Sequence, residues 1–130
     1  MTVLAVNNGT GADLDVWTPA CPLASLLAGR GVAVLLADGT QAALFRLADG
    51  RLAAVGNIDP IGRAAVMSRG IVGDRRGEPT VASPLGKQVF SLVDGRCLDD
   101  ESYTLPVYDV RVVDGIVEVG SRTATAGADR

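Results

Sequence analysis

Few residues in this sequence could do chemistry, and histidine, the commonest general base, is absent. The 130 residues contain no histidine, and Lys87 is the only lysine. Asp59 and Ser83 are the best candidates for a catalytic base and a nucleophile. A serine nucleophile needs a positioned base, which is usually histidine, and only Lys87 could take that place. A lone carboxylate in a loop is more often a turn cap than a general acid, so we expect no catalytic residue.

The two cysteines, Cys21 and Cys97, could in principle form a disulfide or ligate a metal. A disulfide is disfavoured in a reducing compartment, and zinc or an iron–sulfur cluster usually takes four cysteine or histidine ligands. The sequence has no histidine that could complete such a set. We therefore expect two reduced, partly buried thiols and no bound metal.

A cationic stretch is the other candidate for function. Its five basic residues lie within 25 residues of one another: Arg63, Arg69, Arg75, Arg76 and Lys87. The simplest interpretation is a solvated loop face. A docking surface for a protein partner is the functional alternative, because arginine is enriched at interfaces and loops on a rigid β scaffold often bind partners. A site for a small anion is a weaker third interpretation.

Composition excludes several classes of protein. A chain of 130 residues is one domain, and 48% hydrophobic residues suffice for a core. The net charge of −3 argues against a nucleic-acid partner, which needs a concentrated basic surface. No apolar run approaches the roughly 20 residues that span a bilayer, and the N-terminus lacks the pattern of a signal peptide. We expect a cytoplasmic protein with no membrane contact.

Turn signals predict an all-β fold. Asp-Gly occurs four times between apolar segments, at residues 38–39, 49–50, 94–95 and 114–115, and this pair suits tight hairpin turns. Residues 32–37, 41–47 and 51–55 are predicted to form a three-stranded meander. Residues 105–113 alternate between apolar and polar and predict one strand, which pairs with residues 116–119 after the turn.

The remaining segments are less regular. A short helix is predicted over residues 22–28, closed by Gly29, and residues 57–89 read as loops rich in glycine, proline and arginine. The chain shows no internal repeat. We expect a flexible N-terminus over residues 1–12, one domain over residues 13–120 and a disordered tail over residues 121–130.

Two loop segments, residues 57–66 and 81–90, resemble the cluster-binding loops of the Rieske iron–sulfur fold. In that fold one loop carries Cys-x-His and the other Cys-x-x-His. The corresponding positions in this sequence are Asn57 and Asp59 in the first segment and Ser83 and Gly86 in the second. A Rieske cluster needs two thiolates and two imidazoles, so the resemblance implies a Rieske-like antiparallel sandwich or small barrel that has lost its cluster.

A longer set of motifs resembles the small subunit of NAD(P)H-dependent assimilatory nitrite reductase over residues 17–120. The motifs are Asn-Ile-Asp-Pro at 57–60, Val-Met-Ser-Arg-Gly-Ile-Val-Gly at 66–73, Val-Ala-Ser-Pro-Leu at 81–85 and Phe-x-Leu-x-x-Gly-x-Cys-Leu at 90–98. The resemblance implies a non-catalytic subunit that docks onto a large subunit. It further implies that the large subunit carries FAD, an iron–sulfur cluster and siroheme, reduces nitrite to ammonium, and leaves this chain without a cofactor.

Without a cluster, something else must fix the two loops. We expect Asn57, Asp59 and Ser83 to make local hydrogen bonds from side chain to backbone, as these residue types do in turns. Three alternatives remain open. They are an electron-transfer ferredoxin with another cofactor, a free-standing Rieske-like binding module unrelated to nitrite, and a small β-barrel enzyme that acts without a cofactor.

Overall fold

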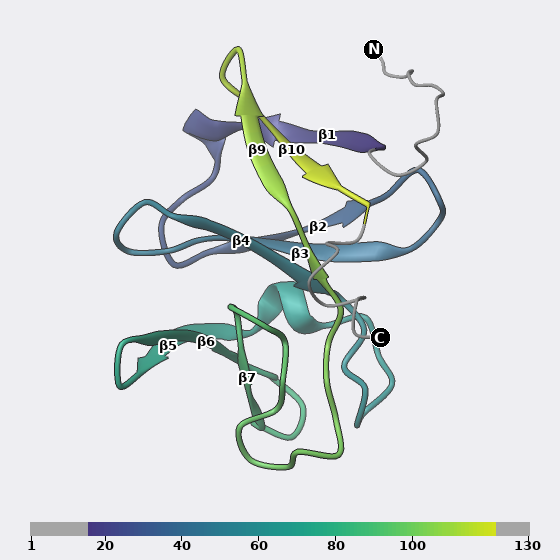
Figure 1. Ribbon diagram of the computed structural model, residues 1–130, viewed down its shortest axis with the longest axis vertical. Coiled ribbons are helices and arrows are strands. Elements are labelled where there is room, and N and C mark those ends of the chain that lie inside the picture. The colour runs from purple at the N-terminus through teal and green to yellow at the C-terminus, as the bar shows by residue number, and fades with distance from the viewer. Residues whose placement is uncertain (1–15, 122–130) are drawn as a thin grey trace.

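The computed structural model describes residues 16–121, which form antiparallel sheets as predicted (Figure 1). Two short 3₁₀ turns occur among these residues, η2 (Leu23–Ser25) and η3 (Met67–Arg69). The strands of the described residues are β1 (Trp17–Pro22), β2 (Gly31–Leu35), β3 (Gln41–Arg46), β4 (Leu52–Gly56), β5 (Ile71–Arg75), β6 (Glu78–Ala82), β7 (Val89–Ser91), β8 (Val107–Tyr108), β9 (Val110–Val113) and β10 (Ile116–Gly120). No helix in this part of the chain has the length and apolarity to cross a membrane.

The strands form three sheets, and the second sheet lies between the other two (Figure 1). The first sheet has the order β1-β10-β9, the second β2-β3-β4-β8 and the third β5-β6-β7. This arrangement gives the second sheet a buried core on each face.

Strand β3 shows how the sequence builds these two cores. Ala42, Ala43, Leu44 and Phe45 are all buried, and successive side chains of a strand point to opposite faces. Ala42 and Leu44 therefore pack toward the first sheet, whereas Ala43 and Phe45 pack toward the third. A continuous apolar run is what a strand buried on both faces requires.

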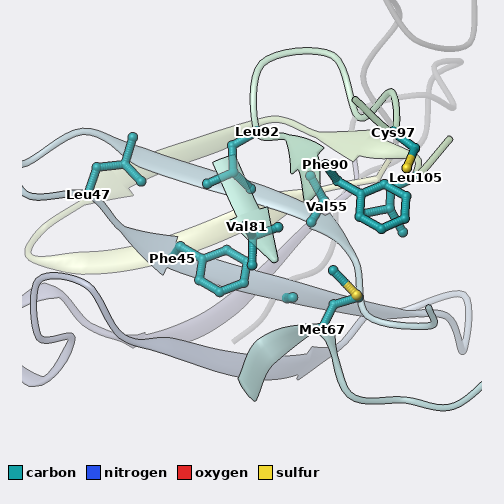
Figure 2. Close-up of a cluster of buried hydrophobic side chains, with 10 residues drawn as sticks. Phe45, Leu47, Val55, Met67, Val81, Phe90, Leu92, Cys97 and Leu105 are labelled. Carbon is teal, nitrogen blue, oxygen red and sulfur yellow. The ribbon is translucent and has the colours of Figure 1, made fainter. Parts of the chain in front are cut away.

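The core between the second and third sheets is the one closest to the two loops (Figure 2). Phe90 is fully buried there. The buried members of this core are Ala43, Phe45, Leu47, Val55, Met67, Val81, Phe90, Leu92, Cys97 and Leu105. Cys97 belongs to this core and is buried, whereas the partly buried Cys21 packs against the other core, and both thiols are free.

The Asp-Gly turns form as predicted, in two kinds. Asp114 and Gly115 both have positive φ, 52° and 81°, and they join Val113 directly to Ile116 in a two-residue hairpin. In the other three turns only the glycine has positive φ. There the aspartate side chain accepts a hydrogen bond from the backbone N–H two residues on: Asp38 from Thr40, Asp49 from Arg51, and Asp94 from Arg96.

The single strand predicted over residues 105–113 is wrong, because the chain changes sheets at Asp109. Tyr108 pairs with Ala54 of β4 in the second sheet, whereas Val110 pairs with Val119 of β10 in the first sheet. The alternating pattern is present on both sides of this break, and alternation alone does not say which neighbour a strand pairs with. Beyond the break the alternation does not match burial, since Val112 on edge strand β9 is 42% exposed.

The helix predicted over residues 22–28 is also wrong, because strand β1 continues through Pro22 and only the 3₁₀ turn η2 follows. The carbonyl oxygens that a longer helix would pair internally accept hydrogen bonds from the Arg46 guanidinium, at 3.3 Å for Leu23 and 3.1 Å for Leu26. Gly29 N then donates to Arg46 O at 2.6 Å. Contacts with β3 therefore replace the helical ladder.

The predicted N-terminal segment of residues 1–12 lies outside the described residues, and so does the predicted tail except for Ser121. Trp17 opens β1 and is half-buried. The guanidinium of Arg111 lies over the Trp17 ring, 4.1 Å from the ring centre, in a cation–π contact across the first sheet.

Candidate functional site

The two predicted loops leave the second and third sheets. The first loop (residues 57–66) follows β4. The second, predicted over residues 81–90, is a loop only over residues 83–88, because residues 81–82 belong to β6 and residues 89–90 to β7. Both loops begin where a strand with buried residues ends, so packing in the core of Figure 2 holds the start of each loop in place. Their conformation is set by their own hydrogen bonds.

In the first loop, Asp59 organises the turn through its backbone and its side chain. Asp59 N donates to Ala64 O at 2.9 Å, and Arg63 N donates to Asp59 O at 2.6 Å. The carboxylate Oδ1 accepts hydrogen bonds from Ile61 N at 2.8 Å and Gly62 N at 3.1 Å. Arg63, which ends the turn, has a left-handed backbone with φ of 63°.

In the second loop, Ser83 takes the same part. Ser83 N donates to Gln88 O at 2.9 Å, and Lys87 N donates to Ser83 O at 2.9 Å. Ser83 Oγ accepts a hydrogen bond from Leu85 N at 3.2 Å. Lys87, which ends this turn, has φ of 64°. The two loops thus contain one turn built twice, with the same hydrogen-bond pattern and the same left-handed basic residue.

The sequence carries a short signal for this duplicated turn. Residues 59–63 read Asp-Pro-Ile-Gly-Arg and residues 83–87 read Ser-Pro-Leu-Gly-Lys. Each is a small polar residue followed by proline, a branched apolar residue, glycine and a cation. A five-residue pattern is too short for the structural repeats sought in the sequence, but it is long enough for a repeated turn.

The loops are joined to each other at the two matching positions. Ser83 Oγ donates a hydrogen bond of 2.5 Å to Asp59 Oδ2, and each of these residues is only 1% exposed. A Cβ on Gly62 would lie 2.6 Å from Cδ1 of Leu85, so the tip of the second loop packs on the first. Two of the four positions where the Rieske fold has ligands therefore bond directly to each other.

This environment fixes the charge of Asp59. Burial by itself raises the pKa of the Asp59 carboxyl, but the hydrogen bonds from Ser83, Gly62 and Ile61 together outweigh burial and hold that pKa below its ordinary value. The carboxylate is therefore a poor base at neutral pH. Because Asp59 and Ser83 are both buried, the hydrogen bond between them joins the two loops beneath the surface.

Asn57 pins the base of the first loop to other elements. Its Oδ1 accepts a hydrogen bond from Ser68 N at 2.8 Å, and its Nδ2 donates to Gln41 Oε1 at 3.0 Å. The predicted local bonds from side chain to backbone are confirmed for Asp59 and Ser83. Asn57 also bonds to backbone, but its partner lies eleven residues away in η3.

Gly86, at the fourth position, has its side-chain space filled by a neighbour. A Cβ on Gly86 would overlap Oε1 of Gln88. That oxygen is buried, and no group among the described residues donates a hydrogen bond to it. A side chain at position 86 would have to displace Gln88 first.

The five predicted basic residues come from different segments of the chain. Arg63 and Lys87 lie on the two joined loops, Arg69 ends η3, and Arg75 and Arg76 lie on the β5–β6 hairpin, which projects away from the loops (Figure 1). Arg75 forms an ion pair of 3.5 Å with Asp99.

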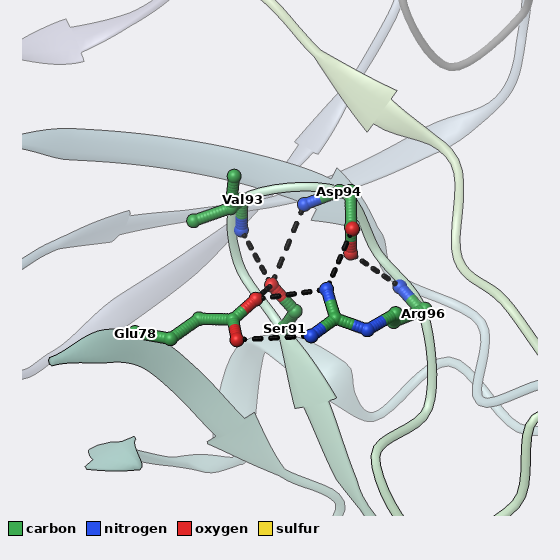
Figure 3. A network of polar contacts seen from close by, with 5 residues as sticks. All are labelled: Glu78, Ser91, Val93, Asp94 and Arg96. Atoms are coloured by element: carbon green, nitrogen blue, oxygen red, sulfur yellow. Dashed lines mark hydrogen bonds and ion pairs between the residues drawn. The ribbon is translucent and has the colours of Figure 1, made fainter. Parts of the chain in front are cut away.

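A polar network after β7 is a feature that no sequence pattern predicted (Figure 3). Glu78 on β6 accepts a 2.5 Å hydrogen bond from Ser91 Oγ and holds both terminal nitrogens of Arg96, at 2.9 and 3.0 Å. Asp94 also contacts Arg96, at 2.6 Å. The bonds from Ser91 and Arg96 lower the pKa of Glu78. The network anchors residues 91–96 to β6 and thereby holds the strand that follows the second loop.

Comparison with known proteins assigns the family. The sequence model of the Rieske-like [2Fe-2S] domain family matches residues 16–120. The "Nitrite reductase (NADH) small subunit" of Salmonella typhimurium is 43% identical over 107 residues, which are 82% of this chain and 98% of that protein. This chain belongs to the nitrite reductase small-subunit family.

Two further relatives bear on this small-subunit family. The crystal structure of an NADH-dependent nitrite reductase small subunit from Mycobacterium tuberculosis superposes with a TM-score of 0.81 at 57% identity, over 84% of this chain and 97% of that one. The "Nitrite reductase [NAD(P)H] large subunit" of Klebsiella oxytoca is 38% identical over 113 residues, which are 87% of this chain and 12% of that protein.

The residues of this small subunit do not fit the [2Fe-2S] cluster for which its domain family is described. The four ligand positions hold Asn57, Asp59, Ser83 and Gly86, and the sequence has no histidine at all. The first three side chains are committed to hydrogen bonds, and Gln88 fills the space over the fourth position. Among the described residues no group of three or more His, Cys, Asp or Glu side chains could hold a metal ion.

Proposed function

We propose that this chain is the non-catalytic small subunit of an NAD(P)H-dependent nitrite reductase and that its partner is the large subunit of that enzyme. The observation that carries this proposal is the Klebsiella relative, whose large-subunit polypeptide contains a segment similar to 87% of this chain. A domain that is part of the large chain in one relative, and a separate subunit in others, acts on the same enzyme in both. We expect one copy of this chain for each large subunit.

We further propose that the redox cofactors, FAD, an iron–sulfur cluster and siroheme, reside on the large subunit in the cytoplasm. The four occupied ligand positions support this distribution, because they leave this chain nothing with which to bind a Rieske cluster. Electrons then pass from NAD(P)H to nitrite within the large subunit, and this chain supplies a surface that stabilises or positions it.

The conformation of the loops supports a binding role. The Asp59–Ser83 hydrogen bond and the packing of Leu85 on Gly62 keep the two loops together without a cofactor. A surface that is rigid before binding loses less conformational entropy when a partner docks. The loops, with the basic residues Arg63 and Lys87, are the region where we expect contact.

Reconstitution tests the proposal. The large subunit is purified with and without this chain, and co-elution, stoichiometry and NAD(P)H-dependent nitrite reduction are measured. We expect co-elution in a one-to-one ratio and a gain in turnover. No association and no change in activity would contradict the proposal and leave a free-standing Rieske-like binding module. An iron assay on this chain alone tests the cofactor proposal, and stoichiometric iron would overturn it.

A further inference from the structure

Left-handed backbone conformation in this protein coincides with positive charge. The described residues include four non-glycine residues with positive φ: Arg63 at 63°, Arg76 at 55°, Lys87 at 64° and Asp114 at 52°. Residues other than glycine, asparagine and aspartate lose free energy in this conformation. Three of the four are nevertheless long cations, and glycine or asparagine would build the same turns without that strain.

Two of these cations occupy equivalent positions of the duplicated turn. Arg63 and Lys87 each end a loop, and the loops are joined by the Asp59–Ser83 hydrogen bond. Both cationic side chains are exposed, and no carboxylate of the described residues lies within ion-pair distance of either. By contrast, Arg75 already pairs with Asp99. The duplicated turn thus presents two cations whose charge the described part of the chain does not neutralise.

Apolar side chains accompany these cations. Ile58 in the first loop is 46% exposed, and Leu85 in the second is 51% exposed. Leu85 lies against Gly62, the residue before Arg63, and Ile58 pairs with Ala65 in the first loop, so these apolar and cationic groups belong to the two joined loops, which we call the tip. Exposed apolar groups rimmed by charge are typical of a protein interface, in which arginine and apolar anchors carry much of the binding energy.

We propose that this tip, made of Arg63, Lys87, Ile58 and Leu85, is the surface that docks onto the large subunit, at a site where carboxylates border an apolar patch. This inference rests on the proposed function. It limits the docking surface to two of the five basic residues predicted from the sequence. In this proposal the costly left-handed backbone conformation is retained because it directs both cationic side chains toward the large subunit. Stability of the isolated chain gives no reason to keep a cation at these positions.

Asparagine substitutions test the tip. Arg63→Asn, Lys87→Asn and the double variant remove charge and keep a residue that tolerates left-handed backbone, so each variant remains folded. Arg76→Asn is the matched control, because Arg76 is also left-handed and in no ion pair among the described residues, but lies on the β5–β6 hairpin. The double variant Arg75→Asn with Arg76→Asn matches the charge change of the double tip variant.

The measurement is the dissociation constant for the purified large subunit, at low and high salt. We expect the double tip variant to bind about tenfold more weakly or worse, with each single variant intermediate and the hairpin variants within about twofold of the unsubstituted chain. High salt is expected to reduce the difference, because exposed charges are screened.

Each other outcome is decisive. Equal weakening by tip and hairpin variants would show a general effect of net charge and would overturn the inference, as would an unchanged dissociation constant of the double tip variant. In both cases the unsubstituted chain still binds, so the proposed function stands. If the unsubstituted chain fails to bind the large subunit, the proposed function fails and this inference fails with it.

Discussion

Removal of the Ser83 hydroxyl is the most direct test of how the loops hold together without a cluster. Ser83→Ala deletes the 2.5 Å hydrogen bond to the Asp59 carboxylate and the 3.2 Å bond from Leu85 N. It leaves Asp59 buried with only the donors Ile61 N and Gly62 N. The loss therefore falls on a charged acceptor that water cannot reach.

The magnitude follows from these contacts. A hydrogen bond to a charged group contributes about 1.5–3 kcal/mol and a neutral one about 0.5–1.5 kcal/mol. Because Leu85 is exposed, water can replace part of the second bond. We expect Ser83→Ala to lower the free energy of unfolding by about 2–3 kcal/mol at pH 7. A domain of this size remains folded, since stabilities of about 5–15 kcal/mol are usual.

Urea denaturation of the purified variants measures the effect, with Ser68→Ala as the matched control. No hydrogen bond of the Ser68 hydroxyl occurs among the described residues, and we expect this control to change stability by less than about 0.5 kcal/mol. If Ser83→Ala costs no more than Ser68→Ala, the Asp59–Ser83 bond does not hold the loops, and some other contact must replace the cluster.

Three further results are expected. Asp59 has a lowered pKa, so its contribution to stability is present above the unfolded pKa of about 3.9 and is lost as the pH falls through the folded pKa. Unfolding measured across an acid titration should therefore show a smaller difference in stability between Ser83→Ala and the unsubstituted chain near pH 2 than at pH 7. Gln88→Met removes a buried oxygen with no donor among the described residues, and thermal denaturation should show an increase in stability of about 1 kcal/mol; a loss of that size would mean that the oxygen has a partner. Gly95 has φ of 82°, and the Cβ that Gly95→Ala adds would overlap the carbonyl oxygen of Leu105. Circular dichroism of this variant should therefore show a chain that does not fold. A native spectrum would contradict this packing.

Turn chemistry made most of the fold predictable. The Asp38-Gly39 turn joins β2 to β3, and the Asp49-Gly50 turn joins β3 to β4. Each turn is closed by hydrogen bonds within five residues of sequence. Local interactions of this kind depend on residue type and spacing alone. The same holds for the bonds of Asp59 to Ile61 and Gly62, which were predicted from the residue type.

The errors lie where distant segments decide the structure. Residues 105–113 alternate as one strand would, but the break at Asp109 follows from pairing with β4 on one side and β10 on the other. Residues 22–28 could form a helix in isolation, but the Arg46 side chain and backbone of β3 take the hydrogen bonds. Tertiary contacts routinely override local preference of this size.

Residue types and spacing are enough to predict an all-β chain without histidine. The resemblance to the Rieske loops was also needed to identify positions 57, 59, 83 and 86 as ligand positions that hold neither cysteine nor histidine. Tertiary structure decided that Asp59 and Ser83, 24 residues apart, meet in a buried hydrogen bond. This bond and the packing of Leu85 on Gly62 bring together the loops that carry Arg63 and Lys87, whereas Arg76 lies on the β5–β6 hairpin.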